Sequence, residues 1–438
     1  MPLDKIVDFY RGKLIKSTQE LVAIPSVKGD PLEGKPFGEG INRALEYTLE
    51  LGEKLGFLVG NVDGYAGFIE FGQGSETLGI LAHLDVVPEG EGWTYPPYGG
   101  EIHDNRIYGR GAIDNKGPAL AALYAMKAVM ESGVSVNKKV RLILGTDEES
   151  GWADMDYYFN KQSMPDFGIT PDANYPVIHA EKGIVHIELC KEFNGAGNGE
   201  RSPILRVKGG SRANMVPDNC TYMLQGKADP INVKGVSAHG STPAKGENAI
   251  AKALKDLWDR GLGNEPIDKF IADLYKLVGM DTTGEGLGIK CRDDVSGDLT
   301  LNLGVIHVDS EVGKAVLDIR FPVEYTQGEI LLKVHEKLKG TGIDVRVLHG
   351  QKPLHVPKDH FLVETLIRVY KEQTGEESAE PLSIGGGTYA RALDTGVAFG
   401  AVFPGRPELA HQKDEYIDIE DLVLNTRIYA HAIAELVR

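Results

Sequence analysis

The chain has 438 residues, of which 42% are hydrophobic and 25% charged, a composition typical of a soluble protein of about two domains. Its 47 Lys and Arg residues against 64 Asp and Glu residues give a net charge of −17, which argues against nucleic acid or an anionic membrane surface as partner and favours a small ligand. The N-terminus MPLDKIVDFYRGKLIK has no apolar signal core, no uncharged run is long enough to span a bilayer, and the three Cys residues form no CxxC pair, so we expect a cytoplasmic protein with reduced thiols.

The first region alternates strand and helix patterns. The runs TLGILAHLDVV (77–87) and KVRLILGT (139–146) have the length of buried strands, and GPALAALYAMKAVMESG (117–133) between them is typical of a helix that is apolar on most sides. This order predicts a parallel sheet covered by helices on both faces, with ligands bound beyond the carboxyl ends of its strands. His83 and Glu148 both lie at such ends.

The middle region, from about 183 to about 356, has a different pattern. Its expected strands alternate polar and apolar residues, which indicates a sheet with one open face, and helices are expected near 246–259 and 327–339. The Gly-rich connection 194–203 is expected at the surface. The strands are GIVHIELCKEF, CTYMLQGKA, INVKGVSAHG, LTLNLGVIHV and KAVLDIRFPV.

The last region returns to the first pattern. We expect a helix at about 359–374, the loop SIGGGTYAR, the strand VAFGAVFPG and a closing helix from about Ile419. We therefore predict one catalytic domain made from residues 1–182 and 357–438, with residues 183–356 inserted as a second domain.

Five stretches place His or carboxylate groups where hydrolases hold divalent metals, on strand ends and loops. In AHLDVVP, Asp85 follows His83 by two residues and can orient its imidazole if the strand persists. In isolation each stretch also has a structural reading, such as a helix cap or a solvated loop. The stretches and their candidate ligands are AHLDVVP with His83, YGRGAIDNKG with Asp114, TDEESG with Glu148 and Glu149, TPDAN with Asp172, and AHQKDEYI with His411.

Taken in chain order, these stretches resemble a family of co-catalytic metallopeptidases that includes aminoacylases, acetylornithine deacetylase and succinyl-diaminopimelate desuccinylase. The similarity runs over nearly the whole chain, including GRGAIDNKGP, TDEESG, RANMVPDN, AHGSTPAKGENAI, DIRFPV and SIGGGTYAR, and is nearest to the PepV-type dipeptidases of Gram-positive bacteria. The resemblance implies an α/β fold: a zinc-peptidase-like catalytic domain with a mostly parallel sheet and flanking helices, plus an inserted α+β lid domain of ferredoxin-like type.

The same resemblance implies two divalent metal ions, with zinc as first candidate and manganese or cobalt as alternatives. Two adjacent carboxyl groups such as those of Glu148 and Glu149 resist being ionised together unless cations are close. Glu148 would then act as general base on a bridging water. The peptide bond from Asp114 to Asn115 would be cis. The implied ligands are His83 and Asp172 for one metal, Glu149 and His411 for the other, and Asp114 as the bridge.

Residues of the inserted domain are implied in substrate recognition. His239 in SAHGSTP matches the transition-state histidine of the family, and Asn214 and Arg320 belong to its substrate-binding surface. The planar guanidinium of Arg320 suits a substrate carboxylate. Backbone donors of the glycine run 385–387, with Gly386 and Gly387, are expected at the same carboxylate.

The expected activity is hydrolysis of dipeptides by a monomer, since the long insert resembles the arrangement in which an enlarged lid replaces a partner subunit. A deacylase of N-acyl amino acids, or a desuccinylase, would use the same metals and base. A catalytically silent peptide-binding relative would be expected to lose Glu148 or a ligand, and all of them are present.

Overall fold

The computed structural model describes residues 2–193 and 202–438. Most of the expected surface connection 194–203 lies outside the described residues. The chain divides into two compact units: unit 1 comprises 1–179, 356–382 and 387–438, and unit 2 comprises 180–355 and 383–386.

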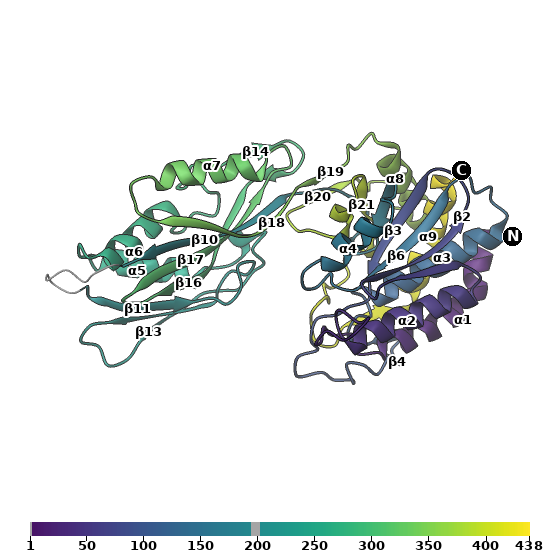
Figure 1. The fold of residues 1–438 in the computed structure, drawn as a ribbon, viewed down its shortest axis with the longest axis horizontal. Coiled ribbons are helices and arrows are strands. Elements are labelled where there is room, and N and C mark those ends of the chain that lie inside the picture. The colour runs from purple at the N-terminus through teal and green to yellow at the C-terminus, as the bar shows by residue number, and fades with distance from the viewer. Residues whose placement is uncertain (1, 194–201) are drawn as a thin grey trace. The chain divides into compact units, whose positions relative to one another are not determined.

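Unit 1 is built on a mixed sheet whose central strands are parallel (Figure 1). In the order β1-β2-β6-β3-β7-β21-β9, the pairs from β6 to β21 are parallel, whereas β1, β2 and β9 pair in antiparallel fashion. The parallel core is the one that the strand–helix–strand order predicts. The bounds are β1 (Leu58–Val62), β2 (Ala66–Gly72), β3 (Thr77–His83), β6 (Lys139–Gly145), β7 (Phe167–Thr170), β9 (Ile178–Glu181) and β21 (Gly396–Ala398).

Helices cover both faces of this sheet. Ile80 and Ala82 of β3 belong to a large core formed with α1, α2, α3, α8 and α9, whereas Leu81 and Ile143 belong to a smaller core with α4 and η2. Because both faces are covered, the central strands are buried throughout and read as continuous apolar runs. The bounds are α1 (Leu3–Val22), α2 (Glu39–Lys54), α3 (Lys116–Ser132), α4 (Ala153–Lys161), α8 (Phe361–Thr374), η2 (Tyr389–Ala392) and α9 (Ile419–Leu436).

Helix α3 is buried on nearly all sides, as its apolar sequence predicts. It ends at Gly133, whose φ of 82° is a left-handed conformation that glycine adopts without strain. Asp114 and Asn115 lie immediately before it, so a firmly packed helix anchors this part of the chain.

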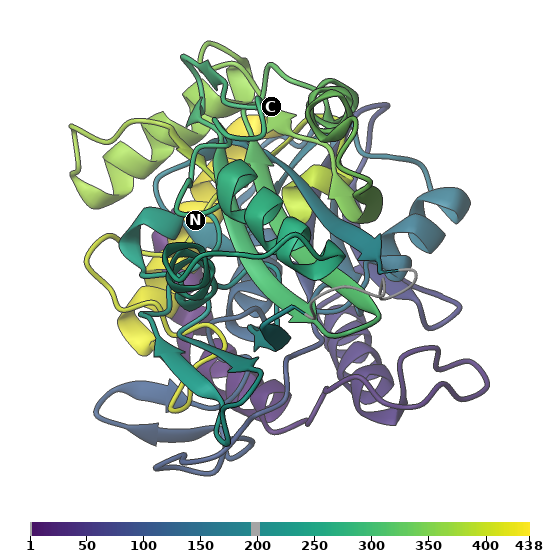
Figure 2. The same ribbon diagram turned by 90° about the vertical axis from the view of Figure 1, so that its left-hand side faces the viewer.

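Unit 2 contains a seven-stranded antiparallel sheet with the order β13-β12-β11-β16-β17-β10-β18. Figure 2 brings these teal and green strands and their helices to the front. Val185, Ile187 and Leu189 of β10 are buried in one core with α5, α6 and α7, while His186 and Glu188 between them are partly exposed. The bounds are β10 (Gly183–Glu192), β11 (Ile204–Gly209), β12 (Asn219–Leu224), β13 (Ile231–Lys234), α5 (Ala249–Asp259), α6 (Pro266–Leu277), β16 (Thr300–Val308), β17 (Val312–Phe321), α7 (Gln327–Leu338) and β18 (Asp344–Gln351).

Short elements complete the two units. A three-stranded antiparallel sheet joins β4, β5 and β23, and β8 pairs with β22. The bounds are β4 (Glu101–His103), β5 (Arg106–Tyr108), β8 (Ala173–Asn174), η1 (Pro243–Lys245), β14 (Arg292–Asp293), β15 (Gly297–Asp298), β19 (Leu354–His355), β20 (Leu382–Ile384), β22 (Ala401–Val402) and β23 (Tyr416–Asp418).

Candidate metal centre

The expected metal ligands of unit 1 gather at one edge of its sheet. His83 is the last residue of β3, Glu149 follows β6 and Asp172 follows β7. Because β6, β3 and β7 are parallel neighbours, their carboxyl ends meet at the same edge. Asp114 comes from the loop before α3 and His411 from the loop between β22 and β23.

The carboxylate of Asp114 lies between two imidazoles. Its Oδ1 is 3.0 Å from Nε2 of His83, and its Oδ2 is 3.2 Å from Nε2 of His411. The peptide bond from Asp114 to Asn115 is cis. One carboxylate thus presents one oxygen to each histidine, which is the geometry of a bridging ligand.

Each imidazole has a second carboxylate beside it. Nε2 of His83 is 3.8 Å from Oδ1 of Asp172, and Nε2 of His411 is 3.0 Å from the carboxylate of Glu149. One ligand atom from each of His83, Asp114 and Glu149 lies within 4.8 Å of the others. The five side chains therefore divide into two groups that share Asp114.

The same contacts shift the proton affinities of these groups. Burial lowers the pKa of His83, but hydrogen bonds to Asp114 and Asp172 outweigh it and hold that pKa well above its ordinary value. Hydrogen bonds to Asp114 and Glu149 raise the pKa of His411 to about 10. A proton on either imidazole occupies the place of a cation, so a divalent metal would displace it as it binds.

The donor set fits two divalent metal ions. It consists of two imidazoles and three carboxylates, which are ligand types of zinc and manganese enzymes. With Asp114 shared, each metal position receives three protein ligands. Three ligands leave coordination positions open for water, as in catalytic rather than structural sites.

Asp85 holds the loop that carries the two adjacent glutamates. Its Oδ1 accepts the backbone N–H of Glu148 at 3.2 Å and its Oδ2 accepts that of Glu149 at 3.0 Å. Nδ1 of His83 lies 3.0 Å from the backbone oxygen of Asp85 and 3.5 Å from its carboxylate. The backbone carbonyl thus makes the closer contact to the imidazole, whereas the sequence suggested the carboxylate for that task.

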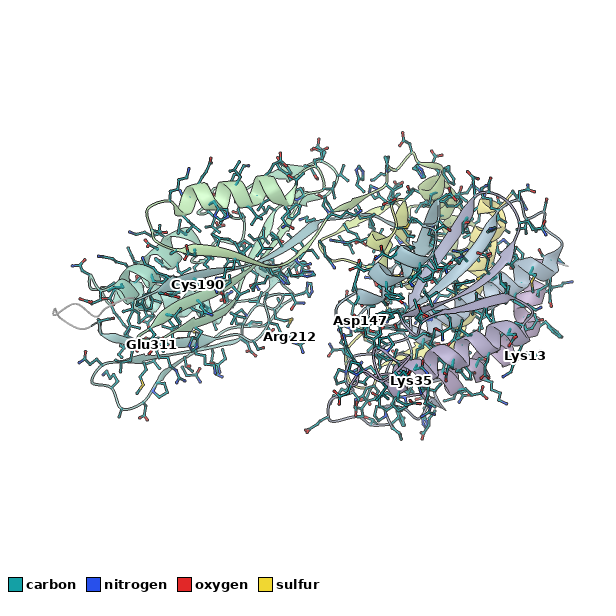
Figure 3. The ribbon with its side chains drawn as sticks, in the orientation of Figure 1. Lys13, Lys35, Asp147, Cys190, Arg212 and Glu311 are labelled. Carbon is teal, nitrogen blue, oxygen red and sulfur yellow. The ribbon has the colours of Figure 1, made fainter. Side chains whose placement is uncertain are left out.

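The three consecutive acids after β6 have different surroundings. Asp147, labelled in Figure 3, forms an ion pair with Lys28 at 2.6 Å. Burial raises the pKa of Glu148 well above its ordinary value, and the charges of Asp172 and Glu149 add to this. A carboxyl group with a raised pKa can take up and release a proton near neutral pH.

Sequence reasoning missed the buried pair of Arg110 and Glu415. Oε1 of Glu415 accepts the backbone N–H of Asp114 at 3.2 Å, and its Oε2 lies 2.7 Å from Nη1 of Arg110. Nη1 of Arg110 also donates to the backbone oxygen of Gln412 at 3.1 Å. The pair therefore ties the loop of Asp114 to the loop of His411, although Glu415 follows Lys and Asp in AHQKDEYI and resembles a solvated charge there.

Asn115 is a second supporting residue that the sequence did not single out. Its Nδ2 donates to the backbone oxygen of Pro171 at 2.7 Å and to Oδ1 of Asp172 at 3.2 Å. The side chain thus joins the loop before α3 to the ligand that follows β7. Its only signal in the sequence is its place next to Asp114.

A cavity of about 390 Å³ opens beside the ligands. Its lining includes Asp114, Glu148, Glu149, Asp172 and His411, together with Leu409 and other apolar residues. A larger cavity of about 660 Å³ in unit 2 is lined by Lys191, Lys269, Lys276 and Trp258, and among the described residues its lining includes a single carboxylate, Asp273, and no histidine. The smaller cavity, with its convergent polar groups, is the candidate binding site for a small ligand.

In unit 2, Arg320 on β17 already has an internal partner. Its Nε and Nη2 donate to the two carboxylate oxygens of Asp318 at 2.6 and 2.9 Å, and its Nη1 donates to the backbone oxygen of Gly385 at 3.1 Å. From the sequence, a substrate carboxylate was expected to accept the paired hydrogen bonds of Arg320. In the structure, the carboxylate of Asp318 accepts them. Within residues 2–193 and 202–438, these contacts engage three of the five N–H groups of Arg320, which leaves two for a ligand.

Asn214 and His239 lie on neighbouring segments of unit 2. The backbone N–H of Gly240 donates to the backbone oxygen of Asn214 at 2.7 Å. The glycine run is divided between the units, since Gly386 belongs to unit 2 while Gly387 belongs to unit 1 and lines its cavity.

Across residues 2–193 and 202–438, no helix combines the length and the apolar character that crossing a membrane requires.

Comparisons with known proteins identify the family of the chain. A family model described as peptidase family M20/M25/M40 matches residues 79–435. "Putative dipeptidase YtjP" of Bacillus subtilis is 40% identical over 464 residues, covering 99% of each chain. A "Putative dipeptidase" of Staphylococcus epidermidis is 37% identical, covering 99% of this chain and 98% of the relative.

Solved structures show the same fold at low sequence identity. Aminoacylhistidine dipeptidase from Vibrio alginolyticus has a TM-score of 0.64 at 14% identity, with 97% of this chain and 96% of that chain covered. Human carnosine dipeptidase 1 has a TM-score of 0.59 at 17% identity, with 99% of each chain covered.

Proposed function

The chain belongs to peptidase family M20/M25/M40, and we propose that it is a dinuclear metal-dependent dipeptidase that hydrolyses the amide bond of short peptides. Relatives named as dipeptidases over the full length of the chain support this choice. The cavity of about 390 Å³ beside the ligands suits a small substrate.

The observation that carries the proposal is the position of Asp114. Its two oxygens face His83 and His411 at 3.0 and 3.2 Å, and each histidine has a further carboxylate beside it. A single metal would not require a carboxylate whose two oxygens serve two different imidazoles. We propose His83 and Asp172 as ligands of one metal, Glu149 and His411 as ligands of the other, and Asp114 as the bridge.

The proposed reaction uses Glu148 for proton transfer. The two metal ions, when bound, supply hydroxide near neutral pH and polarise the scissile carbonyl group. Glu148 takes the proton of the attacking water and later returns it to the leaving amine. Asp85 keeps Glu148 in place through the backbone N–H groups of 148 and 149.

Substrate recognition is proposed for residues of unit 2 and the glycine run. We propose that His239 stabilises the negative charge of the transition state, and that Asn214 and Arg320 bind the substrate. The two uncommitted N–H groups of Arg320 and the backbone N–H groups of Gly386 and Gly387 are proposed donors to its carboxylate.

The metal and the cellular setting are proposed from ligand type and sequence. Zinc is the first candidate, with manganese or cobalt as alternatives, because imidazole and carboxylate ligands do not select sharply among these ions. We propose that the protein acts in the cytoplasm as a monomer.

The test is removal and return of metal with a panel of substrates. Chelation is expected to abolish hydrolysis of dipeptides, and zinc, manganese or cobalt is expected to restore it at two ions per chain. Dipeptides should be cleaved faster than tripeptides or N-acyl amino acids. Full activity of metal-free protein would refute the mechanism, and a preference for N-acyl amino acids would identify a deacylase instead.

A further inference from the structure

Asn302 is a buried polar residue of strand β16 and is only 2% exposed, between the buried Leu301 and Leu303. Its Nδ2 donates to the backbone oxygen of Ala213 at 2.8 Å and to that of Met215 at 2.9 Å. Its Oδ1 lies 3.3 Å from Nδ2 of Asn248. Because a rotated carboxamide would place its oxygen against two carbonyl oxygens, the observed orientation is set, and both of its hydrogens are used on either side of Asn214.

Backbone packing extends this contact from Asn214 to His239. A Cβ atom at Gly304, two residues along β16 from Asn302, would lie 2.3 Å from the backbone oxygen of Ala213. Glycine at 304 therefore lets the segment lie directly on the strand. On its other side, the backbone oxygen of Asn214 accepts the N–H of Gly240 at 2.7 Å, so the residue next to His239 is bound to the same segment.

The ring of His239 is oriented by Ser241. Nδ1 of His239 lies 2.7 Å from Oγ and 3.2 Å from the backbone N of Ser241. A backbone N–H can only donate, so Nδ1 accepts, and the neutral imidazole carries its hydrogen on Nε2. A donor at Nε2 is what a transition-state oxyanion requires.

We propose that Asn302 is a positioning residue for hydrolysis, which holds Asn214 and, through the backbone contact at Gly240, His239 in one arrangement. The inference rests on the proposed function, because only a hydrolase of this kind would use Asn214 and His239 on its substrate. A buried Asn that only had to satisfy its own hydrogen bonds could donate to any carbonyl groups nearby. Asn302 donates both hydrogens of its amide to the two residues that flank Asn214.

The test is Asn302→Asp, which keeps the size of the side chain but places an acceptor oxygen against the two carbonyl oxygens. We expect two bound metals as in the wild type, and hydrogen exchange at the Gly240 amide faster by about tenfold. The inhibition constant of a phosphinic dipeptide, a transition-state analogue, should rise by about tenfold while the affinity for the product amino acid stays within about threefold. The ratio of the affinity for the analogue to the affinity for the product does not depend on the fraction of folded protein, because unfolded protein binds neither.

The matched control is Asn232→Asp, which makes the same charge change at an exposed position of β13 and should alter neither measurement. If Asn302→Asp does not fold, Gly304→Ala displaces the same segment without adding charge and should reproduce both effects. Wild-type exchange at Gly240 or an unchanged affinity for the analogue in either folded variant would overturn the inference. If the wild-type protein itself does not bind the analogue, the proposed function fails and the inference falls with it.

Discussion

In the stretch TDEES, three adjacent carboxylates differ in their chemistry because each has different partners. Asp147 pairs with Lys28. Burial raises the pKa of both glutamates, but the hydrogen bond from His411 opposes this rise at Glu149, whereas the pKa of Glu148 stays well above its ordinary value. Residue type alone does not distinguish these acids. Their partners come from distant parts of the chain.

Replacing the two glutamates one at a time separates their proposed roles. Glu148→Gln is expected to lower kcat by about 10²–10⁴-fold, because the general base is lost. Two metals should remain bound, because no proposed ligand is removed. Glu149→Gln should instead weaken metal binding, since it removes a proposed ligand. Metal analysis together with kcat at saturating metal checks both, and the opposite pattern would mean that the roles are exchanged.

The pH dependence of stability tests the buried Asp154. Burial raises its pKa to about 6, while the hydroxyl group of Tyr389 and the backbone N–H groups of Thr146 and Met155 stabilise the ionised form. The folded state therefore holds the proton more tightly than the unfolded state, and the contribution to the free energy of unfolding is lost as pH rises from about 4 to 6.

Tyr389→Phe removes a donor to the Asp154 carboxylate and so raises the pKa of Asp154 further. We expect the loss of unfolding free energy relative to wild type to be larger at pH 8 than at pH 5, by about 1–3 kcal/mol. Urea titrations of both proteins with a chelator present give this difference. Equal losses at the two pH values would contradict the linkage.

At the scale of elements, the sequence predicts best where a pattern is continuous. Strands β3 and β6 and helix α3 lie within a few residues of their expected bounds, because strands covered on both faces are apolar throughout. The strands β1 and β2 and the helices α2 and α6 were not predicted. In α2 and α6 only one face is buried, so polar residues interrupt the apolar positions and no continuous apolar run marks the element.

Two loops of unit 1 depend on one buried ion pair. Glu415→Gln would leave the guanidinium of Arg110 buried beside an uncharged partner. We expect the free energy of unfolding to fall by about 3–5 kcal/mol. Metal affinity should fall as well, because the loops of Asp114 and Gln412 both lose their common support.

The control for this variant is Glu420→Gln, which breaks an exposed contact with Arg11. An exposed pair contributes about 0–1 kcal/mol, so stability should change little and metal affinity not at all. Chemical denaturation and metal titration of both variants provide the comparison. Similar losses in the two proteins would show that the Arg110–Glu415 pair has no special role.

For the whole molecule we predict that each chain is functional by itself. Mixing His239→Ala with Glu148→Ala should restore no activity, because neither chain contains both groups. Light scattering at assay concentration should give a mass near 47.6 kDa. Recovered activity together with a stable dimer would show that the site is shared between chains.

The sequence by itself determined the α/β class, the family and the residue types of a dinuclear centre. Continuous apolar runs, and metal-binding side chains at the ends of those runs, are local features that a sequence displays directly. The tertiary structure decided which group supports which. Asp85 accepts a hydrogen bond from the loop of the two glutamates, and Arg320 donates to Asp318. Arg110 donates to Glu415, which lies 305 residues away in the sequence.

Such partnerships are invisible in a single sequence because a buried charge or amide takes whichever partner the packing brings within about 3 Å. Asn302 shows the difference most clearly. The sequence shows only a polar residue between Leu301 and Leu303, while its two acceptors lie 89 and 87 residues away and are brought to it by the fold of unit 2.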